Sequence, residues 1–361
     1  MIDATGLPRI TAMFTTHFYG CKTGGMTDFT HNRRDFLKNA ALGGVALSIT
    51  DSGWPGGFGV EKGKRVGIIG LDTSHSTAFT KALNAAQPNP DYTGYRVVAA
   101  YPYGSRDIES SAKRIPGYTD EVRKLNVEII DSIGALLQKV DVVLLETNDG
   151  RLHLEQVIQV LKAGKRVFID KPVAASLSDV VAIFDASRNY NIPLFTASSL
   201  RYITGIDGID KSQVLGADTF SPAVIEKTHP DLFWYGIHGV ETLYTVMGTG
   251  CREVARVHTD GTDIVVGRWA DGRIGTFRGT RTGKHEYGGT VYGQTGNVRL
   301  GPYNGYEPLL KDIIRYFDTG KVPVTPAETI EIYAFMQAAD ESKRRGGAAV
   351  SLESVMKTVK K

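Results

Sequence analysis

The clearest acid–base pair in this 361-residue sequence is an imidazole and a carboxylate three residues apart, His238 and Glu241. On a helix this spacing places both side chains on one face. Imidazole titrates near neutral pH without a large shift, so His238 is the candidate general base and Glu241 the group that orients it. The alternative interpretation is a partly buried histidine capped by a neighbouring carboxylate.

Aromatic residues precede this pair directly, and two of them, Trp234 and Tyr235, are candidate substrate contacts. An aromatic platform can stack on the apolar face of a sugar, whereas core packing is the alternative for such a cluster. His153 and Arg201 are further candidates to face the same cleft, without an assigned role.

A second group of candidates lies in a turn that should approach a phosphate. Dinucleotide sites use the pattern G-x-G-x-x-G, in which the glycines let the backbone approach the pyrophosphate. The segment 70–75 reads GLDTSH and keeps only the first glycine. A carboxylate at the second glycine position should repel a pyrophosphate unless it turns aside or is neutralised. The cofactor-binding candidates of this turn are Gly70, Asp72, Thr73, Ser74 and His75.

The acidic residue that usually holds the adenosine ribose is also missing, because Ala100 leads into the segment YPYGSR. Ser105 and Arg106 are the candidates to accept a ribose phosphate instead. A metal cluster built from Asp72, His75 and His153 is a further alternative, but Asp-x-x-His spacing alone is weak evidence, and no metal site is predicted.

Short apolar strands alternate with helices around these residues. The pattern predicts a Rossmann-type, doubly wound parallel sheet, an α/β fold that binds ligands at the carboxyl ends of its strands. The expected strands are 64–70, 96–100, 141–146 and 166–170, and the expected helices are 77–86, 133–139 and 154–162.

The remainder of the chain shows a different pattern. Glycine-punctuated extended segments at 263–269, 272–279, 288–293 and 296–300 predict antiparallel hairpins, and 326–345 predicts a long helix. We therefore expect a dinucleotide-binding domain over 63–190. An α+β substrate and oligomerisation domain with an open, mainly antiparallel sheet should follow over 191–361, with its C-terminal helix packing back on the first domain.

One segment carries a family resemblance. Residues 140–172 read VDVVLLETNDGRLHLEQVIQVLKAGKRVFIDKP. The order of strand, short loop, His-initiated helix, LKAGK turn and strand ending in Glu-Lys-Pro resembles the glucose-fructose oxidoreductase, inositol dehydrogenase and rhizopine-catabolism (Gfo/Idh/MocA) family. Here Asp170-Lys171-Pro172 stands for Glu-Lys-Pro, and weaker similarity runs through the chain from Arg65.

The resemblance implies NAD or NADP as the cofactor, with Thr147, Asn148, Asp170 and Lys171 among its contacts. It also implies that Lys171 touches both the nicotinamide region and a substrate hydroxyl, where its charge would stabilise a developing alkoxide. A lysine in a surface loop is the alternative. The family's Asp-x-x-x-His-x-x-Asp helix corresponds to 234–241, with Trp234 in place of the first acid. Members commonly pair through the sheet face, so a homo-oligomer is expected.

The N-terminal segment resembles a twin-arginine export signal. Arg33 and Arg34 precede Phe36, Lys38 and a short apolar run over 40–47 that is too short to be a transmembrane anchor. A buried helix after a basic turn is the alternative. We expect residues 1–62 to be signal and linker, with Met26 as the candidate true start, and the mature protein to be periplasmic.

Composition excludes several classes of protein. The net charge is +3 and the basic residues are scattered, which gives no footprint for nucleic acid, and two distant cysteines indicate neither zinc nor disulfides. The sequence predicts a nicotinamide-dependent oxidoreductase, with tightly bound cofactor, that acts on a sugar, glycoside or cyclic polyol. The alternatives are a non-redox binding protein and a glycosidase that uses a transient NAD-mediated oxidation.

Overall fold

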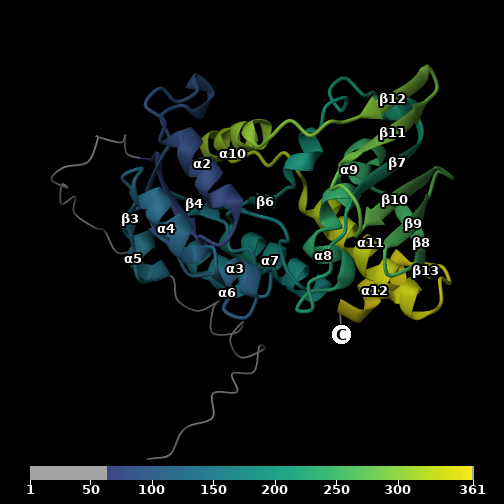
Figure 1. Cartoon of the computed structure of the whole chain (residues 1–361), viewed down its shortest axis with the longest axis horizontal. Helices are drawn as coiled ribbons and strands as arrows, with labels where there is room; N and C mark the ends of the chain where they lie inside the picture. Colours follow the sequence, from purple (N-terminus) through teal and green to yellow (C-terminus); the bar gives the residue numbers. More distant parts are fainter. Residues whose placement is uncertain (1–62, 360–361) are drawn as a thin grey trace, which may run out of the picture. The chain divides into compact units, whose positions relative to one another are not determined.

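A parallel sheet of six strands forms the first half of the computed structural model, which describes residues 63–359 (Figure 1). Its order is β3-β2-β1-β4-β5-β6, and every pairing in it is parallel. The strands are β1 (Arg65–Ile69), β2 (Arg96–Tyr101), β3 (Glu128–Ile129), β4 (Val142–Leu145), β5 (Arg166–Ile169) and β6 (Leu194–Thr196). The strand order reverses between β1 and β4, which confirms the predicted doubly wound sheet.

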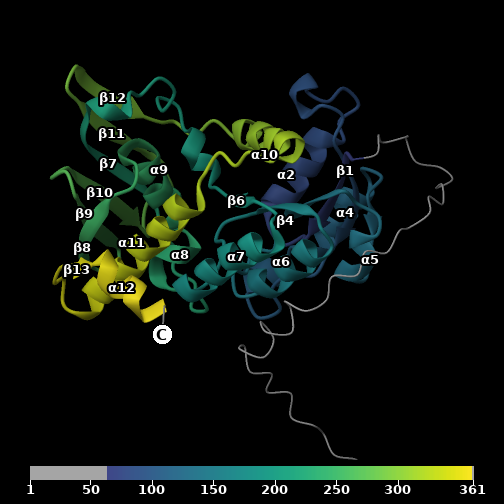
Figure 2. The same cartoon turned by 180° about the vertical axis from the view of Figure 1, so that it is seen from behind.

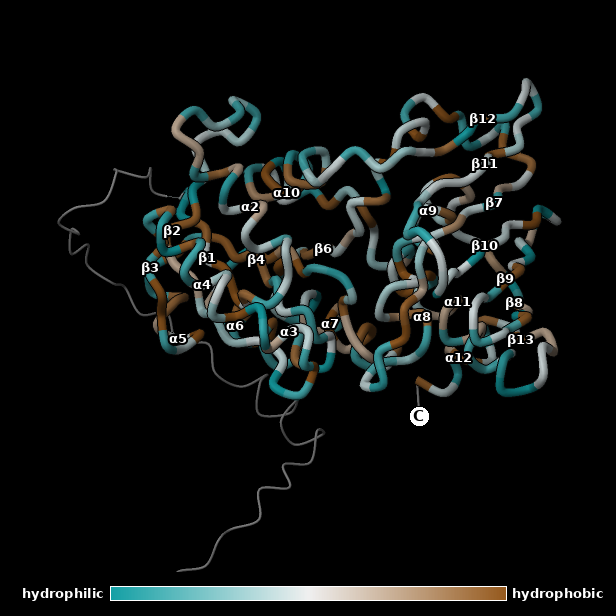
Figure 3. Tube along the Cα trace, in the orientation of Figure 1, coloured by the Kyte–Doolittle hydropathy of each residue, from teal (hydrophilic) through white to brown (hydrophobic). Residues whose placement is uncertain are grey.

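Helices cover both faces of this sheet (Figures 1 and 2). They are α2 (Ser74–Leu83), α3 (Glu109–Ala112), α4 (Ile115–Arg123), α5 (Ile133–Leu137), α6 (His153–Lys162) and α7 (Leu177–Tyr190). The central strands are apolar because both faces are buried, as the brown trace of β1 and β4 shows in Figure 3. Helix α2 begins three residues earlier than predicted, because Thr73 already adopts the extended conformation of an N-cap.

The second sheet has seven strands in the order β12-β11-β7-β10-β9-β8-β13. All its pairings are antiparallel except that of β10 with β7, so the predicted mainly antiparallel sheet is confirmed. Its strands are β7 (Val214–Pro222), β8 (Cys251–His258), β9 (Thr262–Trp269), β10 (Ile274–Thr280), β11 (Gly288–Gly293), β12 (Gly296–Leu300) and β13 (Val350–Ser351). Helices α9 (Ile237–Met247) and α11 (Pro326–Arg344) pack against it.

The two halves share elements, so the predicted boundary at residue 190 is too early. Strand β6 completes the first sheet at Thr196, and α10 (Glu307–Thr319) returns from the second half to the apolar core around β1. Leu309, Ile313 and Phe317 of α10 are buried there. The C-terminal helix α12 (Leu352–Val359) contacts α7.

The single helix expected over 234–241 is two helices. Helix α8 (Asp231–Trp234) ends before Gly236, and α9 begins at Ile237. Tyr235 leaves the helical conformation at φ −131°, so Trp234 does not share a helical face with His238.

The predicted export signal and the candidate start at Met26 lie outside the described residues. Over 63–359, no helix is both long and apolar enough to cross a bilayer.

Candidate active site

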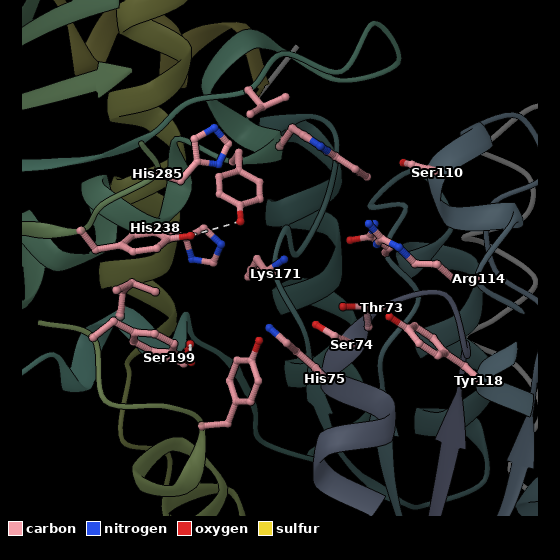
Figure 4. A pocket seen from close by; sticks show the side chains of 18 residues that line it. Thr73, Ser74, His75, Ser110, Arg114, Tyr118, Lys171, Ser199, His238 and His285 are labelled. Carbon is pink, nitrogen blue, oxygen red and sulfur yellow. Dashed lines mark hydrogen bonds between the residues drawn. The ribbon is translucent and has the colours of Figure 1, made fainter. Parts of the chain in front are cut away.

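A cavity of about 380 Å³ lies at the carboxyl edge of the parallel sheet, and residues of both halves line it (Figure 4). The sequence-predicted residues among its lining are Thr73, Ser74, His75, Asn148, Lys171, Trp234, Tyr235 and His238. Eight of the predicted site residues are therefore brought to one place, from segments up to 165 residues apart in the chain. This volume is within the range of small-molecule sites.

The N-terminus of α2 forms one wall of this cavity. Thr73 caps the helix without a side-chain hydrogen bond, and Ser74 and His75 line the cavity from the first turn. Free backbone N–H groups at a helix start attract anions. Arg114 lines the same wall and adds a positive charge.

Gly70 adopts a φ of +92° directly after β1, where a Cβ would stand 2.5 Å from the backbone nitrogen of Thr147. Only glycine fits this close approach of two strand ends, which explains why the first glycine of the motif is present.

Asp72, at the second glycine position, turns away from the cavity. Its carboxylate is buried and accepts the backbone N–H groups of Ser105 at 3.0 Å and Asn148 at 2.9 Å. Burial raises the pKa of Asp72 to about 6, and the two backbone donors limit that rise. Asp72 therefore does not repel a pyrophosphate in the cavity in the way that the sequence had suggested. Its hydrogen bonds instead connect the loops that follow β1, β2 and β4.

The loop after β2 is used internally. Ser105 donates its N–H to Asp72, and its hydroxyl accepts the N–H of Ile108 at 3.2 Å. Ser105 is 1% exposed and is therefore not available for the ribose phosphate that the sequence suggested.

Below the cavity, three side chains converge at the switch point of the sheet. His75 Nδ1 lies 2.8 Å from Asp170 Oδ2, and the ligand atoms of His75, Glu146 and Asp170 lie within 4.8 Å of one another. Burial and the charge of Asp170 raise the pKa of Glu146 well above its ordinary value. The pKa of Asp170 is lowered, because the charges of His75 and Lys171 outweigh its burial.

His238 enters the cavity from α9 with its ring fixed by a serine. His238 Nδ1 lies 2.6 Å from Ser198 Oγ, so Nε2 is the nitrogen left for a substrate. Burial, with the nearby charges of Lys171 and His75, lowers the pKa of His238 well below its ordinary value. The ring is therefore neutral at physiological pH and able to accept a proton.

The prediction that Glu241 orients His238 directly is wrong. The Glu241 carboxylate is not hydrogen-bonded to His238 in the described structure; it accepts the N–H of Ser198 at 2.8 Å and pairs with Arg201 at 2.9 Å. Burial raises the pKa of Glu241, and Arg201 opposes the rise. Ser198 connects the two residues: its backbone N–H donates to Glu241, and its hydroxyl lies 2.6 Å from His238 Nδ1.

Arg201 and His153 do not face the cavity. Arg201 is buried between Glu241 and Glu328, since a buried guanidinium requires paired carboxylates. His153 is fully buried, with its ring nitrogens 2.6 Å from the carbonyl oxygen of Thr147 and 3.1 Å from that of Val173. His153 thus joins the loops after β4 and β5, and the cluster with Asp72 and His75 that was weighed as an alternative does not form.

Thr147 and Asn148 follow β4 at the same edge. Thr147 is fully buried beside Gly70, whereas Asn148 lines the cavity and donates its side-chain amide to Ser111 at 2.9 Å. Of the two predicted cofactor contacts, only Asn148 therefore reaches the cavity.

More aromatic residues line the cavity than the predicted Trp234 and Tyr235. Tyr235 Oη lies 3.1 Å from Tyr287 Oη and its ring packs edge-on against His238 at 5.0 Å, while Trp234 packs on His229. Sequence analysis missed Tyr287, Tyr303 and other lining residues, because they come from separate loops without a shared motif. The missed lining residues are Ser110, Arg114, Tyr118, Ser199, Leu200, Val224, His285, Tyr287, Tyr303 and Tyr306.

Glu146 was also missed as a site residue. It directly follows an apolar strand at the switch point, and this position was the available signal.

Comparisons with known proteins agree with this architecture. Residues 64–197 match the model of the Gfo/Idh/MocA family, described as an oxidoreductase family with an NAD-binding Rossmann fold. An 85-residue stretch, 23% of this chain, is 29% identical to an uncharacterized oxidoreductase of Streptococcus pneumoniae serotype 4, and it spans 23% of that relative's length.

Two solved structures have the same fold over most of the chain. A probable dehydrogenase from Thermotoga maritima is 21% identical, with a TM-score of 0.63, over 81% of this chain and 99% of that one. Myo-inositol dehydrogenase from Lactobacillus casei, solved with NAD(H) and myo-inositol, is 18% identical, with a TM-score of 0.63. The match covers 80% of this chain and 96% of that one.

The fold is therefore that of the Gfo/Idh/MocA dehydrogenases. Residues 64–197 match an NAD-binding Rossmann domain of an oxidoreductase family, which confirms the nicotinamide class of the predicted cofactor.

Proposed function

We propose that this protein is an NAD- or NADP-dependent dehydrogenase that oxidises a hydroxyl group of a sugar, glycoside or cyclic polyol. The observation that carries the proposal is the meeting of Lys171 and His238 in one cavity whose opposite wall is the start of α2 (Figure 4). An ammonium, a neutral imidazole and an anion-binding helix start are the groups that hydroxyl oxidation beside a dinucleotide requires.

The residues present fit the phosphates of a dinucleotide. The start of α2 lacks a side-chain cap, Gly70 leaves the space that a Cβ would fill, and Asp72 is turned into the protein. Thr73, Ser74 and Arg114 are the groups that would hold the pyrophosphate. When bound, the nicotinamide would supply the acceptor for the hydride.

His238 and Lys171 divide the handling of the substrate hydroxyl. His238 Nε2, neutral because of burial, would take the hydroxyl proton, while Ser198 holds the opposite ring nitrogen. The Lys171 ammonium would stabilise the oxygen as negative charge develops on it. Both residues are more than 90% buried, and the exclusion of water strengthens these interactions.

Aromatic and hydroxyl groups favour a neutral, polyhydroxylated substrate. Trp234, Tyr235, Tyr287 and Tyr303 supply ring faces for apolar C–H surfaces and phenol groups for hydrogen bonds. Myo-inositol in the Lactobacillus casei enzyme is a substrate of this class, although that enzyme shares only the fold.

The proposal includes export. The arginine pair before the apolar run at 40–47 supports transport by the twin-arginine machinery to the periplasm. Free dinucleotide is scarce there, so we propose a cofactor that stays bound through turnover, in a homo-oligomer.

The test is native mass spectrometry of protein purified without added nucleotide, followed by turnover assays on inositols, monosaccharides and glycosides. We expect stoichiometric dinucleotide, whose mass distinguishes NAD from NADP, and reduction of that cofactor by at least one of these compounds. A mass without nucleotide, together with no absorbance change on any of them with either nucleotide added, would contradict the proposal.

His238→Ala refines this test. We expect it to abolish turnover while the nucleotide mass is retained, because His238 is not among the groups around the start of α2. Unchanged turnover would remove His238 from the mechanism.

A further inference from the structure

The three groups below the cavity form a site that the proposed reaction does not use. His75 Nδ1, both oxygens of Glu146 and both oxygens of Asp170 are buried and have no hydrogen-bond partner of suitable geometry within residues 63–359. The residues themselves are 4%, 0% and 0% exposed. Asp170 has the His75 contact at 2.8 Å, whereas Glu146 has none among residues 63–359. Buried polar atoms are nearly always satisfied, so an unpartnered carboxylate beside a second one points to a missing cation.

We propose that His75, Glu146 and Asp170 bind one divalent transition-metal ion of the Zn²⁺ or Mn²⁺ class. Their candidate ligand atoms all lie within 4.8 Å of one another. Bonds of about 2.0–2.2 Å to nitrogen and oxygen hold the ligand atoms of one ion about 3–4 Å apart, so an ion would draw these three side chains slightly closer together. One imidazole and two carboxylates carry a net charge of −2, which such an ion balances.

The sheet holds these ligands rigidly. Glu146 directly follows β4 and Asp170 directly follows β5, and both extend the strand ladder, with Glu146 N donating to Ile69 O and Asp170 N to Leu145 O at 2.8 Å. His75 stands in the first turn of α2, after β1. The three ligands thus come from the carboxyl ends of adjacent strands at the switch point, where doubly wound folds bind ligands.

A neighbouring carboxylate shows what a satisfied group looks like at the same edge. Asp72 is equally buried, but two backbone N–H groups occupy its oxygens. Glu146 has no such donors, and Lys171 is the cation that acts on both Glu146 and Asp170. His75 acts on Asp170 in addition, so Glu146 is the carboxylate left without a hydrogen-bonded cation in the described part of the chain. His75 lines the cavity, which gives an ion a path of entry.

The experiment measures metal content of the untagged full chain by inductively coupled plasma mass spectrometry, after incubation with Zn²⁺ or Mn²⁺ and removal of excess metal. We expect one equivalent in the wild type and in the control Glu155→Gln, which removes an exposed carboxylate of α6. Glu146→Gln should weaken binding by about tenfold or more, because it removes a charged ligand.

Thermal unfolding provides a second readout that separates loss of metal from loss of fold. The midpoint of the wild type should rise when Zn²⁺ or Mn²⁺ is added, and that of Glu146→Gln should not. In chelator, Glu146→Gln should be at least as stable as the wild type, because the substitution removes a buried carboxylate.

A wild type that takes up no stoichiometric metal, or a Glu146→Gln variant that binds metal as tightly as the wild type, would overturn the proposal. The first result would instead indicate a protonated Glu146 that shares its proton with Asp170. Neither result bears on nucleotide content or turnover, so the metal site and the dehydrogenase proposal fail independently.

Discussion

Buried charges are treated differently in the two halves of this molecule. In the second half, Arg256 is completely buried and pairs with Asp263 at 2.8 Å, Asp340 at 2.6 Å and Asp231 at 2.9 Å. At the carboxyl edge of the first sheet, Glu146 and Asp170 are as deeply buried, yet within the described part of the chain Glu146 has no hydrogen-bond partner and Asp170 has only the ion contact with His75.

The difference separates structural charges from functional ones. A buried ion network with complete partners stabilises or specifies a fold, and its loss exposes an unpaired charge. A buried carboxylate without a partner destabilises the fold unless something else binds it, so its presence at a ligand-binding edge indicates a function. The Arg256 network belongs to the first kind and the Glu146 cluster to the second.

The largest expected effect comes from breaking the complete network. Arg256→Gln should lower the free energy of unfolding by about 3–5 kcal/mol, because it leaves Asp263 buried without its main partner. Urea denaturation measures this change, and Glu146→Gln, measured in chelator, is the matched comparison. If both variants lost the same stability, the distinction between the two regions would be wrong.

The next largest effect concerns Lys171, which lines the cavity and also acts on Glu146 and Asp170. Lys171→Met should reduce turnover by about 10²–10³-fold, the usual loss when one charge-stabilising donor is removed. Because the Lys171 charge lowers the pKa of His238, the pH profile of the remaining activity should move to higher pH.

Steady-state kinetics across pH measures both effects of Lys171→Met. Lys124→Met removes an exposed ammonium from the end of α4 and serves as the control. Full activity in Lys171→Met would exclude this lysine from the reaction.

Much of the fold could be predicted because its signals are local. The apolar strand runs at 141–146 and 166–170 correspond to β4 and β5, and the glycine-bounded segments 288–293 and 296–300 correspond to β11 and β12. The return of α10 to the first core could not be predicted, since its apolar face is compatible with either sheet. The break before α9 was missed because helical spacing does not reveal where Tyr235 leaves the helix.

The cavity-lining residues that could be predicted from the sequence are mainly those that belong to a recognisable motif. Lys171, His238 and residues 73–75 of the turn line the cavity, whereas Asp72 and Gly70 do not. Glu241 and Arg201 were misassigned, because a spacing of three fixes a helical face and does not fix the direction of a long side chain. Tyr287 and Tyr303 reach the cavity through tertiary contacts alone.

A smaller effect concerns pH and the satisfied carboxylate Asp72. Its folded pKa is about 6, mainly through burial, against an ordinary value of 3.8. Between these values the folded protein holds this proton more tightly than the unfolded chain, so the contribution of Asp72 to stability is largest below pH 4 and is lost as pH rises to 6. The two-unit difference corresponds to about 2–3 kcal/mol.

Urea denaturation between pH 4 and pH 6 measures how steeply the free energy of unfolding changes with pH, and this slope tests the pKa of Asp72. Asp72→Asn should remove the Asp72 contribution to the decline, about 2–3 kcal/mol, whatever the variant's absolute stability. Some decline should remain, because burial also raises the pKa of Asp340 to about 7. Asp107→Asn is the control, because Arg151 lowers the pKa of the exposed Asp107 to about 2 and its titration lies below the window. An unaltered slope in Asp72→Asn would show that other groups cause the decline.

The smallest effect tests whether Ser198 positions His238. Ser198→Ala removes the hydroxyl 2.6 Å from His238 Nδ1 and should lower kcat about tenfold, about 1.4 kcal/mol, with little change in KM. The hydroxyl also accepts the N–H of Leu200, so some stability is lost as well.

Ser176→Ala supplies the matched control for that loss. Ser176 accepts the N–H of Asp179 at the start of α7, away from the cavity, so its removal should lower stability without changing kcat. Ser198→Thr keeps the hydroxyl and should restore activity. If Ser198 has only a structural role, both alanine variants should lose stability similarly and the pH profile of kcat should stay unchanged. If Ser198 positions His238, the pH profile of kcat should shift in Ser198→Ala alone, because the hydroxyl is part of the environment of the imidazole that accepts the proton.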